Sequence, residues 1–208
     1  MFKYISCHED NDRHYHEYRR YRKGRHPLKA LKQHLYIQRK SIGLAAEKYY
    51  LVGYMYCGKS TYGRRLAEAE GMDFLDLDRA FEQRYHYTVP MFFSRFGEQA
   101  FRQLETQLLH TTAELDNVVI ATGGGTPCHS GNMDFILAHG TAIYLRMPVE
   151  ALVQRALRSR NPRPLMQGLD EEALRSRIAE QLKERESFYS KALIIIDGNN
   201  PVVPLEGA

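Results

Sequence analysis

The chain has 208 residues, of which 43% are hydrophobic, 26% charged and 11% aromatic. This composition is that of a globular protein with one well-buried domain, and it excludes disordered, collagenous and coiled-coil chains. The formal net charge of +4 conceals a basic head: residues 1–48 carry 12 Lys and Arg against 5 Asp and Glu, a balance of +7, which leaves −3 for the remainder.

No segment has the apolar length of a membrane span, and the N-terminus has charge without the apolar stretch of a signal peptide. The three cysteines, Cys7, Cys57 and Cys128, are scattered and odd in number, which indicates neither a disulfide framework nor a zinc site. We therefore expect a cytoplasmic protein with no membrane partner.

The basic head also holds five of the nine histidines and the tyrosine-rich stretch HYHEYRRYRKGRH, which runs from His14 to His26. Basic residues interleaved with tyrosines are typical of nucleic-acid-binding arms, but most such runs are solvated extensions without a partner. We interpret residues 1–48 as a flexible basic extension and residues 49–208 as the folded domain, and we do not expect nucleic-acid binding.

From Tyr49 onward, short apolar runs alternate with longer stretches of helical periodicity, the pattern of a parallel α/β sheet flanked by helices. The clearest helix spans Glu98–Glu114, where Phe101, Leu104 and Leu108 recur on one face. Further helices are expected after Lys59, Ser130, Pro148 and Asp170. The five expected strands are Tyr49–Val52, Phe74–Leu77, Val118–Thr122, Ala142–Leu145 and Leu193–Ile196.

The segment Gly53-Tyr-Met-Tyr-Cys-Gly58-Lys59-Ser60 matches the phosphate-binding pattern G-x-x-x-x-G-K-[ST], between an expected strand and an expected helix. Consecutive backbone N–H groups of such a loop surround phosphates at the positive end of the helix. Lys59 would reach the β- and γ-phosphates, and the Ser60 hydroxyl would hold Mg²⁺. The sequence therefore predicts nucleoside triphosphate binding, without specifying the acceptor.

Four further features are expected near the carboxyl ends of the strands, where ligands bind in open α/β sheets. Asp76-Leu-Asp78 ends the second strand, and strand alternation would direct both carboxylates to one side, toward Mg²⁺ and a substrate hydroxyl. The alternative is a solvated strand end, or a helix N-cap that Asp78 would provide before Arg79. Arg102, oriented by Glu98 and Glu105, could bind a substrate carboxylate or form an ordinary surface ion pair.

The third feature is the triplet Gly123-Gly124-Gly125, which would allow the backbone to approach a small ligand. The fourth is the polar, proline-broken segment Arg158-Ser-Arg-Asn-Pro-Arg163-Pro-Leu, which is typical of a mobile lid with an arginine that could close on the phosphates. An ordinary exposed loop is the alternative.

Taken in this order, the chain from Tyr49 to about Asp197 resembles the shikimate kinase family. The resemblance rests on the phosphate-binding loop followed by Thr61, on the features just described, on Arg163-Pro-Leu, and on Arg185-x-x-x-Tyr189. It implies a nucleoside-monophosphate-kinase-like fold with a five-stranded parallel sheet. It also implies that ATP phosphorylates the 3-hydroxyl of shikimate, a step of aromatic amino-acid biosynthesis through chorismate, and we expect a monomer.

The resemblance implies roles for individual residues. Asp78 would bind the substrate hydroxyls, and Asp76 would support Mg²⁺ beside Ser60. Arg102 and Arg185 would bind the shikimate carboxylate, while the Gly124 and Gly125 backbone would contact the ring hydroxyls. Lys59, Asp78 and Arg163 would be the catalytic residues, and ATP would be bound by Gly53, Gly58, Lys59, Ser60, Thr61 and Arg163.

The sequence departs from the family at Tyr56, where glycine is usual; a positive φ there would strain the loop by roughly 1 to 3 kcal/mol. Two other functions stay open. One is a different small-molecule P-loop kinase, of the gluconate or nucleoside-monophosphate type, which would not need the carboxylate-binding arginines. The other is an impaired nucleotide-binding protein with a basic interaction arm.

Overall fold

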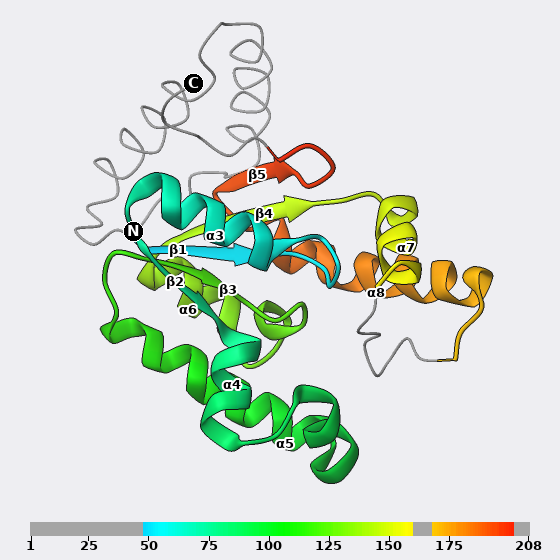
Figure 1. Ribbon diagram of the computed structural model, residues 1–208, viewed down its shortest axis with the longest axis horizontal. Coiled ribbons are helices and arrows are strands. Elements are labelled where there is room, and N and C mark those ends of the chain that lie inside the picture. Colours follow the sequence, from blue (N-terminus) through cyan, green and yellow to red (C-terminus); the bar gives the residue numbers. More distant parts are fainter. Residues whose placement is uncertain (1–47, 160–167, 202–208) are drawn as a thin grey trace, which may run out of the picture. The chain divides into compact units, whose positions relative to one another are not determined.

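The computed structural model describes residues 48–159 and 168–201. They form a five-stranded, fully parallel sheet in the order β2-β3-β1-β4-β5, flanked by helices (Figure 1). The strands are β1 (Lys48–Val52), β2 (Asp73–Asp76), β3 (Val118–Ala121), β4 (Thr141–Arg146) and β5 (Ile194–Asp197). The helices are α3 (Lys59–Glu70), α4 (Leu77–Tyr85), α5 (Val89–Thr111), α6 (Asn132–His139), α7 (Val149–Leu157) and α8 (Glu171–Tyr189), with short 3-10 turns η1 (Thr112–Glu114) and η2 (Thr126–Cys128).

The expected five-stranded parallel sheet is confirmed. β1 is central, with Tyr50 opposite Ile120 of β3 on one side and Ala142 of β4 on the other. Every residue of β1 is buried, which explains why this strand reads as a continuous apolar run and not as an alternating one. In Figure 1, α3 crosses one face of the sheet, while α6 and α8 lie behind it.

The first strand begins one residue earlier than expected, at Lys48. Its ammonium group is buried and donates to the backbone carbonyls of Thr112 and Ala113, each at 2.8 Å. A lysine at the start of a buried strand is accommodated because two backbone carbonyls accept hydrogen bonds from its charged group.

The second strand differs from the expectation in where it ends. β2 stops at Asp76, and α4 begins at Leu77, so Asp76 and Asp78 do not share a strand. The Asp76 carboxylate accepts a hydrogen bond from the Arg79 N–H and caps the helix, whereas Asp78 lies in its first turn. Both carboxylates line one cleft, as predicted. The predicted reason, strand alternation, is wrong, because the local capping bond starts a helix there.

The long helix also begins earlier than expected. α5 starts at Val89, after the Thr88 hydroxyl has accepted a hydrogen bond from the Met91 N–H, and Gly97, at φ 81°, makes a kink inside it. We call the parts of α5 before and after Gly97 its first and second arms. Together with α4 they enclose an aromatic cluster, in which the Phe81 ring centroid lies 5.1 Å from that of Phe92 and 4.8 Å from that of Phe101.

The carboxyl ends of all five strands meet at one edge of the sheet, as parallel pairing requires. The segments that follow β1, β2 and β3 there are the loop 53–58, the start of α4 and the glycine triplet 123–125. No helix in the described part of the chain is both long and apolar enough to cross a membrane.

Candidate active site

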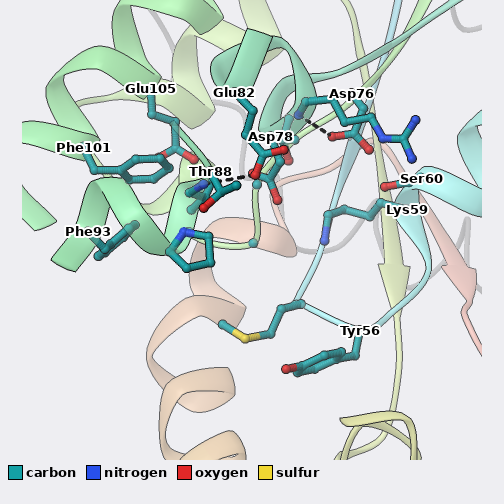
Figure 2. A pocket seen from close by; sticks show the side chains of 18 of the residues that line it. Tyr56, Lys59, Ser60, Asp76, Asp78, Glu82, Thr88, Phe93, Phe101 and Glu105 are labelled. Atoms are coloured by element: carbon teal, nitrogen blue, oxygen red, sulfur yellow. Dashed lines mark hydrogen bonds between the residues drawn. The ribbon is translucent and has the colours of Figure 1, made fainter. Parts of the chain in front are cut away.

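A cleft of about 880 Å³ opens at this edge of the sheet. It brings together residues from the phosphate-binding loop, the start of α4, the second arm of α5, the glycine triplet and α8. Those that carry the argument are Lys59, Ser60, Asp76, Asp78, Arg102, Glu105, Gly124, Gly125 and Arg185. Figure 2 shows Lys59 and Ser60 facing Asp76 and Asp78, with Glu105 beyond Asp78.

The phosphate-binding loop depends on glycine at its two ends. Gly53 has φ 139°, and a side chain there would place its Cβ 2.8 Å from the Leu145 carbonyl oxygen. Gly58, at φ 94°, immediately precedes the first residue of α3. Because only glycine adopts these conformations without strain, the pattern seen in the sequence corresponds to a real geometric need.

The Lys59 side chain turns back over the concave side of this loop. Its ammonium group donates to the carbonyl oxygens of Gly53 at 2.8 Å and Tyr54 at 2.9 Å. The helix that begins here adds the partial positive charge of its N-terminus. The loop therefore concentrates donors and positive charge where a polyphosphate binds.

Tyr56 adopts a left-handed conformation, with φ 66°. Tyr56 lines the cleft, and its ring points away from Ser60 and Asp76 (Figure 2). The backbone carries the cost, which for a bulky residue is of the order of 1 to 2 kcal/mol.

A contact that the sequence did not indicate holds the loop from outside. The Arg155 guanidinium, from α7, donates to the carbonyl oxygens of Cys57 at 3.1 Å and of Gly198, after β5, at 3.1 Å. A helical arginine without a motif carries no signal of such a long-range contact, and only the folded arrangement identifies it.

Arg102 is held by two carboxylates, as its spacing predicted. It donates to Glu98 at 3.1 Å and to Glu105 at 2.7 Å, and only 14% of its side chain is exposed. What the sequence did not show is that Glu105 is itself buried, at 4% exposure, and accepts a second bond from the Thr126 hydroxyl at 2.6 Å. Burial raises the pKa of Glu105, against the opposing effect of the Arg102 charge.

The glycine triplet follows β3 and is closely surrounded. A Cβ at Gly123 would lie 2.5 Å from a Glu105 carboxylate oxygen and 3.1 Å from one of Asp78. At Gly124 the obstacle would be the Met55 N–H at 2.9 Å, and at Gly125 the Arg102 guanidinium at 2.6 Å. The triplet thus lets the loop, the acidic residues and Arg102 approach one backbone segment.

Arg185 reaches the cleft from α8. Its guanidinium carbon lies 5.4 Å from the centre of the Tyr54 ring, and its buried Nη1 atom has no hydrogen-bond partner. A buried donor without a partner is costly in an isolated protein. An anionic ligand in the cleft would satisfy it.

Arg102 and Arg185 act on the same stretch of chain. Both positive charges oppose the effect of burial on Cys128, which still raises the pKa of this thiol to about 11. His129 responds in the opposite sense: burial, and then the Arg102 charge, lower its pKa. Arg102 from α5 and Arg185 from α8 both line the cleft, and we call this pair of arginines its cationic wall.

The other predicted residues fall into two groups. Ser60 and Thr61 line the cleft at the start of α3, beside Lys59. Arg163 lies outside the described residues, so its assignment to the ATP phosphates stays a prediction.

A parallel sheet with a phosphate-binding loop after its central strand, and an acceptor pocket opening onto that loop, defines a P-loop kinase of the nucleoside-monophosphate-kinase-like class. The shikimate kinase family model matches residues 55–203. The chain belongs to the shikimate kinase family.

Individual relatives agree with this assignment. The shikimate kinase of Parabacteroides distasonis is 46% identical over 151 residues, which cover 73% of this chain and 87% of that protein. The crystal structure of shikimate kinase from Bacteroides thetaiotaomicron has a TM-score of 0.72 at 37% identity and covers 78% of this chain and 90% of its own. Shikimate kinase from Acinetobacter baumannii, solved in complex with shikimate, has a TM-score of 0.68 at 37% identity, covering 76% and 86%.

Proposed function

We propose that this protein transfers the γ-phosphoryl group of ATP to the 3-hydroxyl of shikimate. The observation that carries the proposal is the shared cleft, which is lined at one end by Lys59 and Ser60 and at the other by Arg102 and Arg185. Family membership gives the reaction, and this geometry supplies what the reaction needs: an anion-binding loop for the donor and a cationic wall for a carboxylate acceptor.

On the donor side, the backbone from Gly53 to Gly58 would surround the phosphates, with Ser60 and Thr61 at the start of the helix. The Lys59 ammonium would exchange its two carbonyl partners for phosphate oxygens. Phosphoryl transfer needs little covalent assistance from the protein, so positioning and neutralisation of charge would supply most of the acceleration.

The residues at the loop fit Mg²⁺. Ser60 and Asp76 offer hard oxygen ligands on opposite sides of the cleft, facing each other in Figure 2. Mg²⁺ usually keeps several waters and is bound by one or two protein oxygens together with phosphates. The described residues contain no cluster of three or more His, Cys, Asp or Glu able to hold a metal unaided, which agrees with a metal that arrives with ATP. When bound, Mg²⁺ would neutralise charge on the phosphates.

On the acceptor side, Asp78 lies between the loop and the triplet and would accept a hydrogen bond from the attacking hydroxyl. Arg102 and Arg185 would bind the shikimate carboxylate, and the Gly124 and Gly125 backbone would contact the ring hydroxyls. Glu98 and Glu105 keep the Arg102 guanidinium at the wall in the absence of substrate.

Two alternative functions are not favoured. A gluconate or nucleoside-monophosphate kinase is disfavoured by the family, since the shikimate kinase model matches residues 55–203. An impaired nucleotide-binding protein is supported by Tyr56 alone, whose ring points away from Ser60, since the basic residues 1–48 lie almost entirely outside the described part of the chain. We further propose a monomer in the cytoplasm, where ATP is available and where the free thiols of Cys57 and Cys128 would stay reduced.

The test is a panel of acceptors. With ATP and Mg²⁺, purified protein should release ADP when shikimate is added, and not when gluconate or a nucleoside monophosphate is added. No stimulation by shikimate, or equal stimulation by gluconate, would reject the proposal.

The same assay tests the cationic wall. Arg102→Lys keeps the charge but loses the planar fork, so the KM for shikimate should rise at least about tenfold while that for ATP changes little. Arg175→Lys is the matched control, because Arg175 forms a similar i,i+4 pair with Glu171 on an exposed part of α8. Equal changes in both Michaelis constants would remove the wall assignment.

A further inference from the structure

Tyr189, the last residue of α8, contacts the glycine triplet directly. Its side chain is fully buried, and its hydroxyl donates a hydrogen bond to the Gly124 carbonyl. Arg185 lies one turn earlier on the same helix, and its charge opposes the effect of burial on the pKa of this hydroxyl. The motif Arg185-x-x-x-Tyr189 was visible in the sequence, but no role followed for the tyrosine.

The direction of one carbonyl fixes the direction of its whole peptide unit. In a trans peptide, the Gly124 C=O and the Gly125 N–H point to opposite sides. The bond from Tyr189 therefore keeps the carbonyl on the α8 side and turns the Gly125 N–H away from α8. Gly125 lines the cleft beside Arg102.

This peptide unit joins two glycines, which makes a reversal of its direction easier than between residues with side chains. Reversal would present a carbonyl oxygen where a donor now lies, and would repel an oxygen of the bound acceptor. On its other side, Gly124 is packed against the Met55 backbone of the phosphate-binding loop. Among the described residues, Tyr189 is the one whose side-chain hydroxyl holds the Gly124 carbonyl in place.

We propose that Tyr189 is a positioning residue for the acceptor: its hydroxyl locks the Gly124–Gly125 peptide so that the Gly125 N–H serves as a donor to an oxygen of the bound acceptor. The inference rests on the proposed function, since it deepens the assignment of the same cleft. It concerns acceptor binding only, so the affinity for ATP should not depend on it.

Two further observations agree with this role. Burial raises the pKa of Tyr189 well above its ordinary value, so the hydroxyl keeps the proton that it donates. The ring itself packs against Tyr144, with centroids 5.2 Å apart. Because that packing needs no hydroxyl, removing the oxygen alone separates positioning from packing.

The experiment compares Tyr189→Phe with Tyr50→Phe. Tyr50, on β1, is an equally buried tyrosine that does not line the cleft. Its hydroxyl forms a hydrogen bond of 2.7 Å with the Thr112 hydroxyl. For Tyr189→Phe, we expect the KM for shikimate, and its Kd by calorimetry, to rise about three- to tenfold, the range for one hydrogen bond. The KM for ATP should stay within about twofold of wild type, and Tyr50→Phe should change neither constant.

A wild-type KM for shikimate in Tyr189→Phe, an equal rise for ATP, or an equal effect of Tyr50→Phe would overturn the inference. If wild type itself does not phosphorylate shikimate, the proposed function fails instead, and the two failures are distinguishable. A measurement on wild type covers the case in which Tyr189→Phe does not fold: shikimate should slow hydrogen exchange of the Gly125 amide. Unchanged exchange of this amide would also overturn the inference.

Discussion

At Tyr56, the phosphate-binding loop holds a bulky residue in the left-handed region, at φ 66°. The strain is local and independent of substrate, so replacement by glycine should relieve it. Glycine also gains freedom in the unfolded chain, which offsets part of the gain. The two effects leave a net stabilisation of about 0.5 to 1 kcal/mol for Tyr56→Gly.

We also expect Tyr56→Gly to lower the Kd for ATP, because a larger fraction of molecules then holds the binding-competent loop. His86→Gly is the matched control: His86 is left-handed at φ 57°, but it caps the exposed end of α4. The His86→Gly protein should gain similar stability, and its Kd for ATP should not change. Calorimetric titration with ATP decides, and a Kd unchanged or raised in Tyr56→Gly would contradict this view of the loop.

Glu105 gives a prediction about pH. Its pKa is raised in the folded protein, mainly by burial, above an ordinary value near 4.5. A carboxyl group whose pKa is higher in the folded protein binds its proton more tightly there than in the unfolded chain. The contribution of Glu105 to the free energy of unfolding therefore falls as the pH rises from the ordinary pKa through the pKa of the folded protein. Glu105→Gln should remove this fall. The free energy of unfolding of wild type minus that of the variant should therefore decrease as the pH rises through this range.

Glu98→Gln is the control for the pH experiment, because Glu98 bonds the same arginine but has half its side chain exposed. Urea unfolding at a series of pH values measures both variants. Parallel pH profiles for wild type and Glu105→Gln would show that the buried carboxyl does not titrate as described.

The helices and strands with a strong hydrophobic periodicity could be predicted from the sequence. Those whose bounds are set by a single capping bond or a single glycine could not. The five strands were found because apolar runs such as Val118–Ala121 are buried on both faces. The start of α4 was missed because Phe-Leu-Asp-Leu reads as a strand, and the capping bond from Asp76 decides otherwise. The first arm of α5 was missed because the kink at Gly97 interrupts the helical periodicity, so that the two arms do not share one pattern.

The start of α4 allows capping to be separated from metal binding. Asparagine is a good N-cap, so Asp76→Asn should keep the stability of wild type but raise the Mg²⁺ concentration needed for half-maximal turnover. Asp76→Ala should also lose about 1 kcal/mol of stability. The Mg²⁺ dependence of kcat, measured together with thermal unfolding, tests both parts.

Asp170→Ala controls for capping alone, since Asp170 caps α8 by accepting from the Ala173 N–H at 2.8 Å. It should lose similar stability with an unchanged Mg²⁺ requirement. An unchanged Mg²⁺ requirement in both Asp76 variants would remove Asp76 from the metal site.

For the molecule as a whole, the sequence identified ten of the residues that line the cleft, but not how they are supported. Lys59, Asp78 and Arg102 lie in recognisable local patterns, and each lines the cleft as expected. The burial of Glu105 and the contact of Arg155 with the loop depend on residues distant in sequence, Thr126 and Gly198 among them. Such contacts leave no local pattern, so only the folded arrangement shows them.

We propose that the basic head is separate from the catalytic domain. Deletion should end at residue 45 and not at 48, because Lys48 is a buried part of β1. The shortened protein should keep kcat and both Michaelis constants within about twofold of the full chain, since the described residues that line the cleft are all kept. A collapse of turnover, with folding intact by circular dichroism, would show that the head takes part in the reaction.

The most direct measurement follows the phosphoryl group itself. ATP labelled in its γ-phosphate is incubated with the full-length protein, Mg²⁺ and shikimate, and the products are separated. If donor and acceptor meet in one cleft, the label should appear on shikimate in an amount equal to the ADP formed. Label on inorganic phosphate alone, or no loss of label from ATP, would contradict a shared cleft for transfer.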